Sequence, residues 1–153
     1  MSKNPVPVVH IIRSLELGGA QQNTLYTVAN LDRRRFEPHL VWAPGGLLDE
    51  EAMALDRVTL HPVPNMVHAI DPRQDLAAVR DIRAILAPLA DRGSVIVHTH
   101  TAKAGVIGRY AAARAGAGPV IHSIHGFGHD ALNGRLKRRI ALAAERSCAS
   151  SVR

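Results

Sequence analysis

The sequence contains one cysteine, Cys148, among 153 residues, and only 3% of its side chains are aromatic. A single cysteine can form neither an intrachain disulfide nor a cysteine-based zinc site, which fits a reducing compartment. So few aromatic side chains leave no stacking platform for single-stranded nucleic acid. The first apolar run is short and is interrupted by Pro7, so we expect neither a signal peptide nor a membrane-spanning helix there. We therefore expect a cytoplasmic protein, soluble or peripheral to a membrane, without a nucleic-acid partner.

The bulk composition is that of one globular domain. Hydrophobic residues make up 46% of the chain, which is enough to bury a normal core. The formal net charge of +6 favours anionic partners such as phosphates or an anionic membrane surface. We treat residues 1–153 as a single domain.

Five apolar runs rich in valine and isoleucine predict buried strands. They lack the alternation of apolar and polar residues that a sheet with one wet face requires, so we expect both faces of the sheet to be covered. The runs comprise residues 6–12, 39–43, 58–63, 95–98 and 120–124.

Helical patterns lie between most of these runs. Asp71 is placed to cap a helix that begins with Pro72, and apolar residues then follow at helical spacing: Leu76, Val79, Ile82, Leu86 and Leu89. We also expect helices over 19–31, over 104–115 with Gly116 as the C-cap, and over roughly 132–148, and a short helix beginning at Asp49. Alternating strands and helices predict an α/β protein with a doubly wound parallel sheet.

Polar and glycine residues follow three of the predicted strands. Ligands of such sheets bind beyond the carboxyl ends of the strands. His100 and Lys103 follow the strand at 95–98, His125 follows the strand at 120–124, and Gly18-Gly19 precedes a helix N-terminus that can face a phosphate. We expect these three loops to share one cleft, while His98 is satisfied within its strand.

The histidines also allow a metal-dependent hydrolase. His98 and His100 are two residues apart and point to the same face of a strand, as a pair of metal ligands would. Further ligands could come from His122, His125, His129 and Asp130. No second acidic cluster accompanies them, and we favour a site without metal.

In chain order, the sequence resembles the N-terminal half of a retaining, GT4-type glycosyltransferase of the GT-B fold. The stretches that carry the resemblance are "GGAQQNTLYTVANL", "VIVHTHTAKAGVIGRYAAARAGAGPVIHSIHGFG" and "RRIALAAERSCAS". The fold implied is a Rossmann-like domain that mostly binds the acceptor, facing a second domain that binds most of a nucleotide-sugar donor. The function implied is transfer of a sugar from a nucleoside diphosphate sugar to a glycan, lipid-linked or small-molecule acceptor.

The resemblance also implies roles for individual residues. His125 is the catalytic cleft histidine near the transferred sugar, Gly18 and Gly19 approach the donor diphosphate, and His100 and Lys103 belong to the acceptor wall. No metal and no cofactor is implied. The second domain is missing, so we expect a fragment that is inactive alone. A non-catalytic binding module that keeps the acceptor or partner surface is the alternative.

The last predicted helix is basic. Arg135, Lys137, Arg138 and Arg139 could face anionic lipid headgroups at the inner membrane face, or could simply be solvated. Peripheral membrane contact is therefore a further expectation for this chain.

Overall fold

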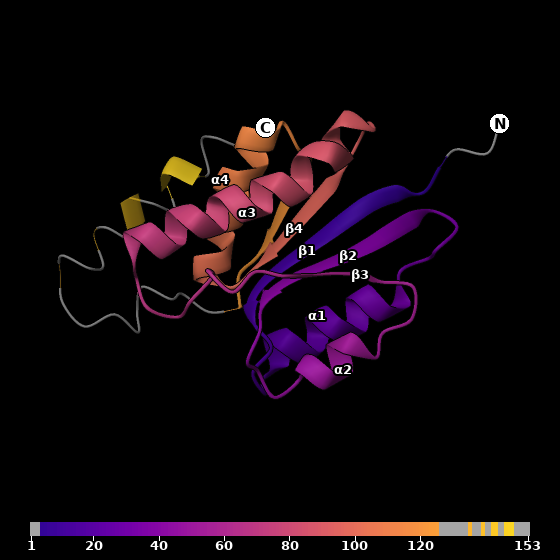
Figure 1. The fold of residues 1–153 in the computed structure, drawn as a ribbon, viewed down its shortest axis with the longest axis horizontal. Helices are drawn as coiled ribbons and strands as arrows, with labels where there is room; N and C mark the ends of the chain where they lie inside the picture. Colours follow the sequence, from indigo (N-terminus) through magenta and orange to yellow (C-terminus); the bar gives the residue numbers. More distant parts are fainter. Residues whose placement is uncertain (1–3, 126–134, 136–138, 140–141, 144–145, 149–153) are drawn as a thin grey trace.

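The chain folds around a five-stranded parallel sheet (Figure 1). The structure is a computed structural model and describes residues 4–125, 135, 139, 142, 143 and 146–148. The strands lie in the order β3-β2-β1-β4-β5. Their bounds, with those of the helices, are β1 Val6–Ser14, α1 Gly19–Asn30, β2 Phe36–Ala43, α2 Asp49–Met53, β3 Thr59–Pro62, α3 Pro72–Asp91, β4 Ile96–His100, α4 Ala102–Ala115 and β5 Val120–Ser123.

Helices cover both faces of the sheet, so the predicted α/β architecture is confirmed. α1 and α2 lie on one face over β1 and β2, and α3 and α4 lie on the other (Figure 1). The strand order reverses beside β1, which pairs with β2 on one side and β4 on the other. This reversal is the topological switch point, where ligands of open α/β sheets bind.

The local signals in the sequence are largely confirmed. Asp71 caps α3 by accepting hydrogen bonds from the backbone N–H groups of Arg73 and Gln74. Gly116 ends α4 in the left-handed conformation, and α2 begins at Asp49. The predicted helix at 132–148 lies largely outside the described residues.

The helical spacing grouped Leu76 with four other apolar residues of α3, but the structure separates it from them. Leu76 is 67% exposed, whereas Val79, Ile82, Leu86 and Leu89 are buried. At 100° per residue, Leu76 projects about 100° away from the mean direction of the other four, at the margin of the apolar face.

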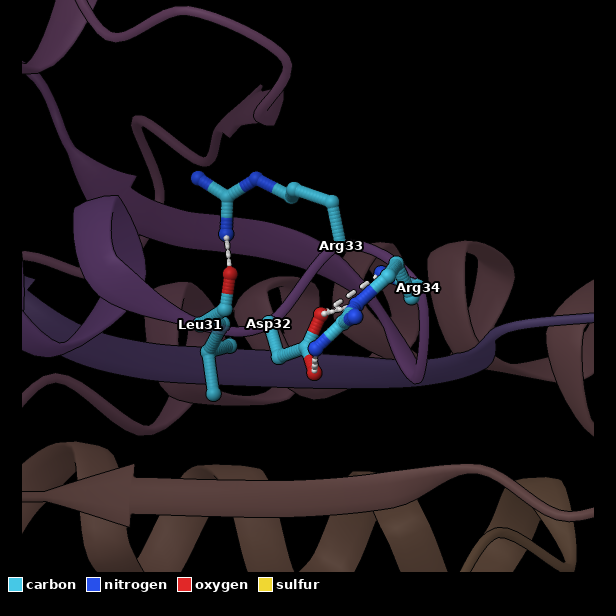
Figure 2. A network of polar contacts seen from close by, with 4 residues as sticks. All are labelled: Leu31, Asp32, Arg33 and Arg34. Atoms are coloured by element: carbon cyan, nitrogen blue, oxygen red, sulfur yellow. Dashed lines mark hydrogen bonds and ion pairs between the residues drawn. The ribbon is translucent and has the colours of Figure 1, made fainter.

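The turn between α1 and β2 is held by polar contacts to the end of the helix (Figure 2). The Arg33 guanidinium donates hydrogen bonds to the carbonyl groups of Val28 and Ala29, which have no partner within the last turn of the helix, and to that of Leu31, the C-cap. Asp32 accepts hydrogen bonds from the backbone N–H and the guanidinium of Arg34. These contacts end α1 and direct the chain into β2.

α4 lies against the sheet through small residues. A Cβ atom at Gly108 would lie 2.6 Å from Thr99 Cγ2 and 3.1 Å from Ile11 Cδ1, and one at Gly105 would lie 2.4 Å from the His122 ring. Real Cβ atoms essentially never come closer than 3.0 Å to other atoms, which excludes the 2.6 Å and 2.4 Å contacts. Gly108 therefore sets how near α4 comes to β1 and β4, and Gly105 sets how near it comes to His122 of β5.

This packing makes Gly108→Ala a destabilising substitution. Alanine normally stabilises a helix relative to glycine, but here the added methyl group must displace Thr99 and Ile11, at a cost of roughly 1–3 kcal/mol. Chemical denaturation will measure the change. Gly19→Ala is the matched control because a Cβ atom there meets nothing within 4 Å, and its stability should be unchanged or higher. Equal stability of the two variants would contradict the packing argument.

Candidate active site

The three strands whose loops carry the predicted site residues lie side by side. β1 pairs with β4, and β4 pairs with β5, all in parallel. Their carboxyl ends therefore lie at one edge of the sheet, which brings the start of α1, the β4–α4 junction and the residues after β5 to the same side of the molecule.

Three histidines form a chain from the middle of the sheet to its edge. His10 Nδ1 of β1 lies 3.0 Å from His100 Nε2 of β4, and His100 Nδ1 lies 3.2 Å from His125 Nε2. His10 and His100 are each 1% exposed, whereas His125 is exposed. His100 thus lies behind His125 and contacts it directly.

His10 was not identified from the sequence. Its only signal is a polar residue in the middle of the apolar stretch "VVHII". The strand register opposes His10 to His98, and His100 follows two residues later on the same face of β4. Only this cross-strand register reveals that His10 belongs with the other histidines.

The remaining histidines of this region have separate partners. His98 Nε2 lies 2.8 Å from Ser123 Oγ, and its ring is tilted against that of His100 at 4.1 Å between centroids. This contact agrees with the expectation that His98 is satisfied within its strand. His122 lies on the α4 side of the sheet, with Nδ1 2.9 Å from Thr99 Oγ1.

The arrangement bears on the metal hypothesis. One nitrogen each from His10, His98 and His100 lies within 4.8 Å of the others, which is a candidate set of three ligands. Two of these nitrogens, His10 Nδ1 and His100 Nε2, already lie at hydrogen-bonding distance from each other. His122 points to the opposite face, while His129 and Asp130 lie outside the described residues.

Burial keeps the inner histidines neutral. Desolvation, with a smaller contribution from His98, lowers the pKa of His10 from 6.5 to about 3. Desolvation, followed by the neighbouring imidazoles, lowers the pKa of His100 to about 2. A neutral imidazole has one donor and one acceptor nitrogen, which is what a chain of ring-to-ring hydrogen bonds needs.

Lys103 connects α4 to its neighbours. Its Nζ lies 2.6 Å from Asp75 Oδ1 of α3 and donates a hydrogen bond to the carbonyl of Ala69. The side chain is 17% exposed. Lys103 therefore holds the loop before α3 against the start of α4 at this edge of the sheet.

Gly18 and Gly19 lie at the start of α1, as predicted. Gly18 is the N-cap in extended backbone conformation, and no side chain caps the helix. The first turn has no acidic residue, and the space where a Cβ of Gly19 would lie is open. The helix start is thus sterically accessible and electrostatically suited to an anion.

Thr101 joins β4 to α4 in an unusual conformation. Its φ of 65° and ψ of 158° fall in a region that glycine almost alone adopts. Such strain costs about 1–3 kcal/mol and persists only where the surrounding structure fixes the backbone. The strained residue directly follows His100, so the backbone beside the histidine chain is tightly constrained.

The buried histidines predict that the protein loses stability in mild acid. Below pH 6.5 the unfolded chain binds protons at His10 and His100, while the folded chain does not until the pH approaches about 3. The contribution of these two histidines to the free energy of unfolding should therefore be fully present above pH 6.5 and should decrease as the pH falls below that value. Between about pH 7 and about pH 5, each histidine contributes a loss of roughly 1–2 kcal/mol.

Urea denaturation at the two pH values will measure this loss. His10→Gln should lose less stability than the unchanged protein over the same interval, because the variant has one fewer group that takes up a proton on unfolding. An identical pH dependence for both proteins would show that His10 is not held neutral.

Comparisons with known proteins point to glycosyl transfer. The family model for the glycosyl transferase 4-like domain matches residues 18–153. The chain is also 29% identical, over 122 residues, to UDP-Gal:alpha-D-GlcNAc-diphosphoundecaprenol alpha-1,3-galactosyltransferase of Escherichia coli. The alignment covers 80% of this chain and 30% of that enzyme, so the chain spans about a third of its relative's length. The matched family, together with the parallel α/β sheet, shows that this chain belongs to the glycosyl transferase 4-like domain family.

Proposed function

We propose that this chain is the acceptor-side domain of a retaining glycosyltransferase that moves a sugar from a nucleoside diphosphate sugar to an acceptor. Family membership supports glycosyl transfer in general. The observation that carries the assignment of the site is the exposed His125, held by His100 at the sheet edge where α1 also begins.

This placement and the family resemblance support the following residue roles. His125 hydrogen-bonds the transferred sugar near the reacting carbon, and the open helix start at Gly18 and Gly19 faces the donor diphosphate. Lys103 belongs to the acceptor side, where it fixes the loop before α3. His100 is buried, so it acts on this side through His125. Catalysis rests on positioning the two substrates and stabilising the departing diphosphate, without a metal or another cofactor.

The acceptor class is a glycan, a lipid-linked sugar or a small molecule. The relative's name specifies a UDP-sugar donor and a lipid-linked diphosphate acceptor. These substrates favour the lipid-linked class for this chain. Because the chain spans 30% of that relative, we place most of the donor-binding residues outside residues 1–153.

A lipid-linked acceptor would bring the protein to the inner face of a membrane. In the part of the chain that the structure describes, no helix is long and apolar enough to cross a bilayer. Arg135, Arg139 and Arg146 are exposed, whereas Lys137 and Arg138 lie outside the described residues. We propose that this basic segment contacts anionic headgroups.

Membrane contact predicts salt-sensitive binding to anionic vesicles. Each well-placed basic residue contributes about 1 kcal/mol, and salt screens this attraction. Replacing Arg135 and Arg139 with glutamine should weaken binding in a co-sedimentation assay at low salt. The control replaces the exposed Arg57 and Arg73 with glutamine, which removes the same charge elsewhere. Equal binding to neutral and anionic vesicles would argue for a solvated helix face.

The catalytic proposal predicts a large loss of turnover for His125→Ala in the complete enzyme. Losing one positioned hydrogen-bonding group near a transition state should lower turnover roughly ten- to a thousandfold. The fold should survive because His125 is exposed. Transfer assays with a panel of nucleotide sugars, together with melting temperatures, will test this expectation.

His98→Ala is the companion variant for this experiment. It should lower stability more than turnover because His98 contacts Ser123 inside the sheet. Unchanged turnover of His125→Ala would remove that residue from the site. Joint loss of a bound metal from variants at His98, His100 and His125 would instead support the hydrolase hypothesis.

A further inference from the structure

The hydrogen bonds along the histidine chain must all run in one donor-to-acceptor direction, and one end of the chain must determine which direction that is. His100 uses both ring nitrogens, Nε2 toward His10 and Nδ1 toward His125. In a neutral imidazole one nitrogen donates and the other accepts. The proton position on one ring therefore determines the proton position on the next, and only two arrangements of the whole chain are consistent.

The buried end favours one of these arrangements. His10 Nε2 is inaccessible to solvent and has no hydrogen-bond partner among the described residues. A buried N–H group without an acceptor is rarer in proteins than an under-satisfied acceptor. His10 is thus better protonated at Nδ1, from which it donates to His100 Nε2.

The remaining protons follow from this choice. His100 accepts at Nε2, so its own proton is on Nδ1 and is donated to His125 Nε2. His125 then accepts at Nε2 and, when neutral, has its proton on Nδ1. Since His125 is exposed, this N–H group is the donor that the chain offers to a ligand.

We propose that His10 and His100 are positioning residues that hold His125 as its Nδ1–H tautomer, which donates a hydrogen bond to an oxygen of the bound sugar. The sugar as the partner rests on the proposed function. The tautomer rests only on the ring contacts and on the buried end of the chain.

A second histidine pair in the same sheet provides an internal comparison. His39 Nδ1 lies 3.0 Å from His61 Nε2. The rings of this pair stack with 5.3 Å between centroids, as do the rings of His10 and His100. Neither His10 Nε2 nor His39 Nε2 makes a hydrogen bond of good geometry among the described residues, but His39 Nε2 has a carboxylate oxygen, Glu37 Oε1, at an ion-pair distance of 3.4 Å. A carboxylate accepts, so His39 should be protonated at Nε2, the opposite tautomer to His10.

Nitrogen NMR of the protein labelled with ¹⁵N-histidine tests the assignment directly. Near neutral pH, His10 and His125 should be protonated at Nδ1 and His39 at Nε2. In His100→Phe, His125 should change to a solvent-averaged mixture of the two tautomers. His61→Phe, which breaks the matched pair, should leave the His125 signals unchanged.

Turnover in the complete enzyme gives the second measurement. His100→Phe should lower kcat about tenfold with little change in KM, and should cause no further loss in a His125→Ala background, because both changes remove one function. A purely structural role would make the two losses multiply. If His100→Phe does not fold, His10→Phe replaces it, and the tautomers of the unchanged protein still decide.

Three results would overturn the inference. They are an Nε2–H tautomer for His10, a His125 tautomer that is unaffected by breaking the chain, and stoichiometric Zn²⁺ binding that shifts the His10, His98 and His100 signals together. Correct tautomers with an active His125→Ala enzyme would instead leave the histidine chain intact and refute the proposed catalytic role.

Discussion

The structure depends on a sheet strand that is covered on both faces and yet carries a polar ring. β1 lies in the middle of the sheet, and Val9, Ile11 and Ile12 around His10 are fully buried. A buried polar group is costly unless it finds a partner, and the partner must come from a neighbouring strand. His100 of β4 fills that need. The same contact links the core of the sheet to the edge at which β1, β4 and β5 end.

The sequence predicted the framework because the framework is specified locally. Unbroken apolar runs, the cap and proline at Asp71-Pro72, and the glycine at 116 each act within a few residues. The exposure of Leu76 was not predicted, because the spacing of apolar residues is also a local signal. It does not tell which margin of a helix the sheet covers. The close approach at Gly108 also depends on the partner strands, whose positions the pattern does not contain.

The candidate site was predicted less completely than the fold. The order of elements was enough to bring Gly18, His100 and His125 to one edge. It could not reveal His10, nor that Lys103 would pair with Asp75, because both contacts join segments distant in sequence. A lone histidine in an apolar strand carries no spacing signal. Its role emerges only when the strand register is known.

The small residues of α4 also constrain how this domain can diverge. With Gly105 and Gly108 closing the space between α4 and the sheet, larger side chains cannot be introduced there without moving the helix, and the β4–α4 junction at Thr101 moves with it. Sequence changes are therefore accommodated more readily in the loops than in the helix layer. A changed loop would leave His125 held in the same place by His100, so the loops and the histidine chain can diverge separately.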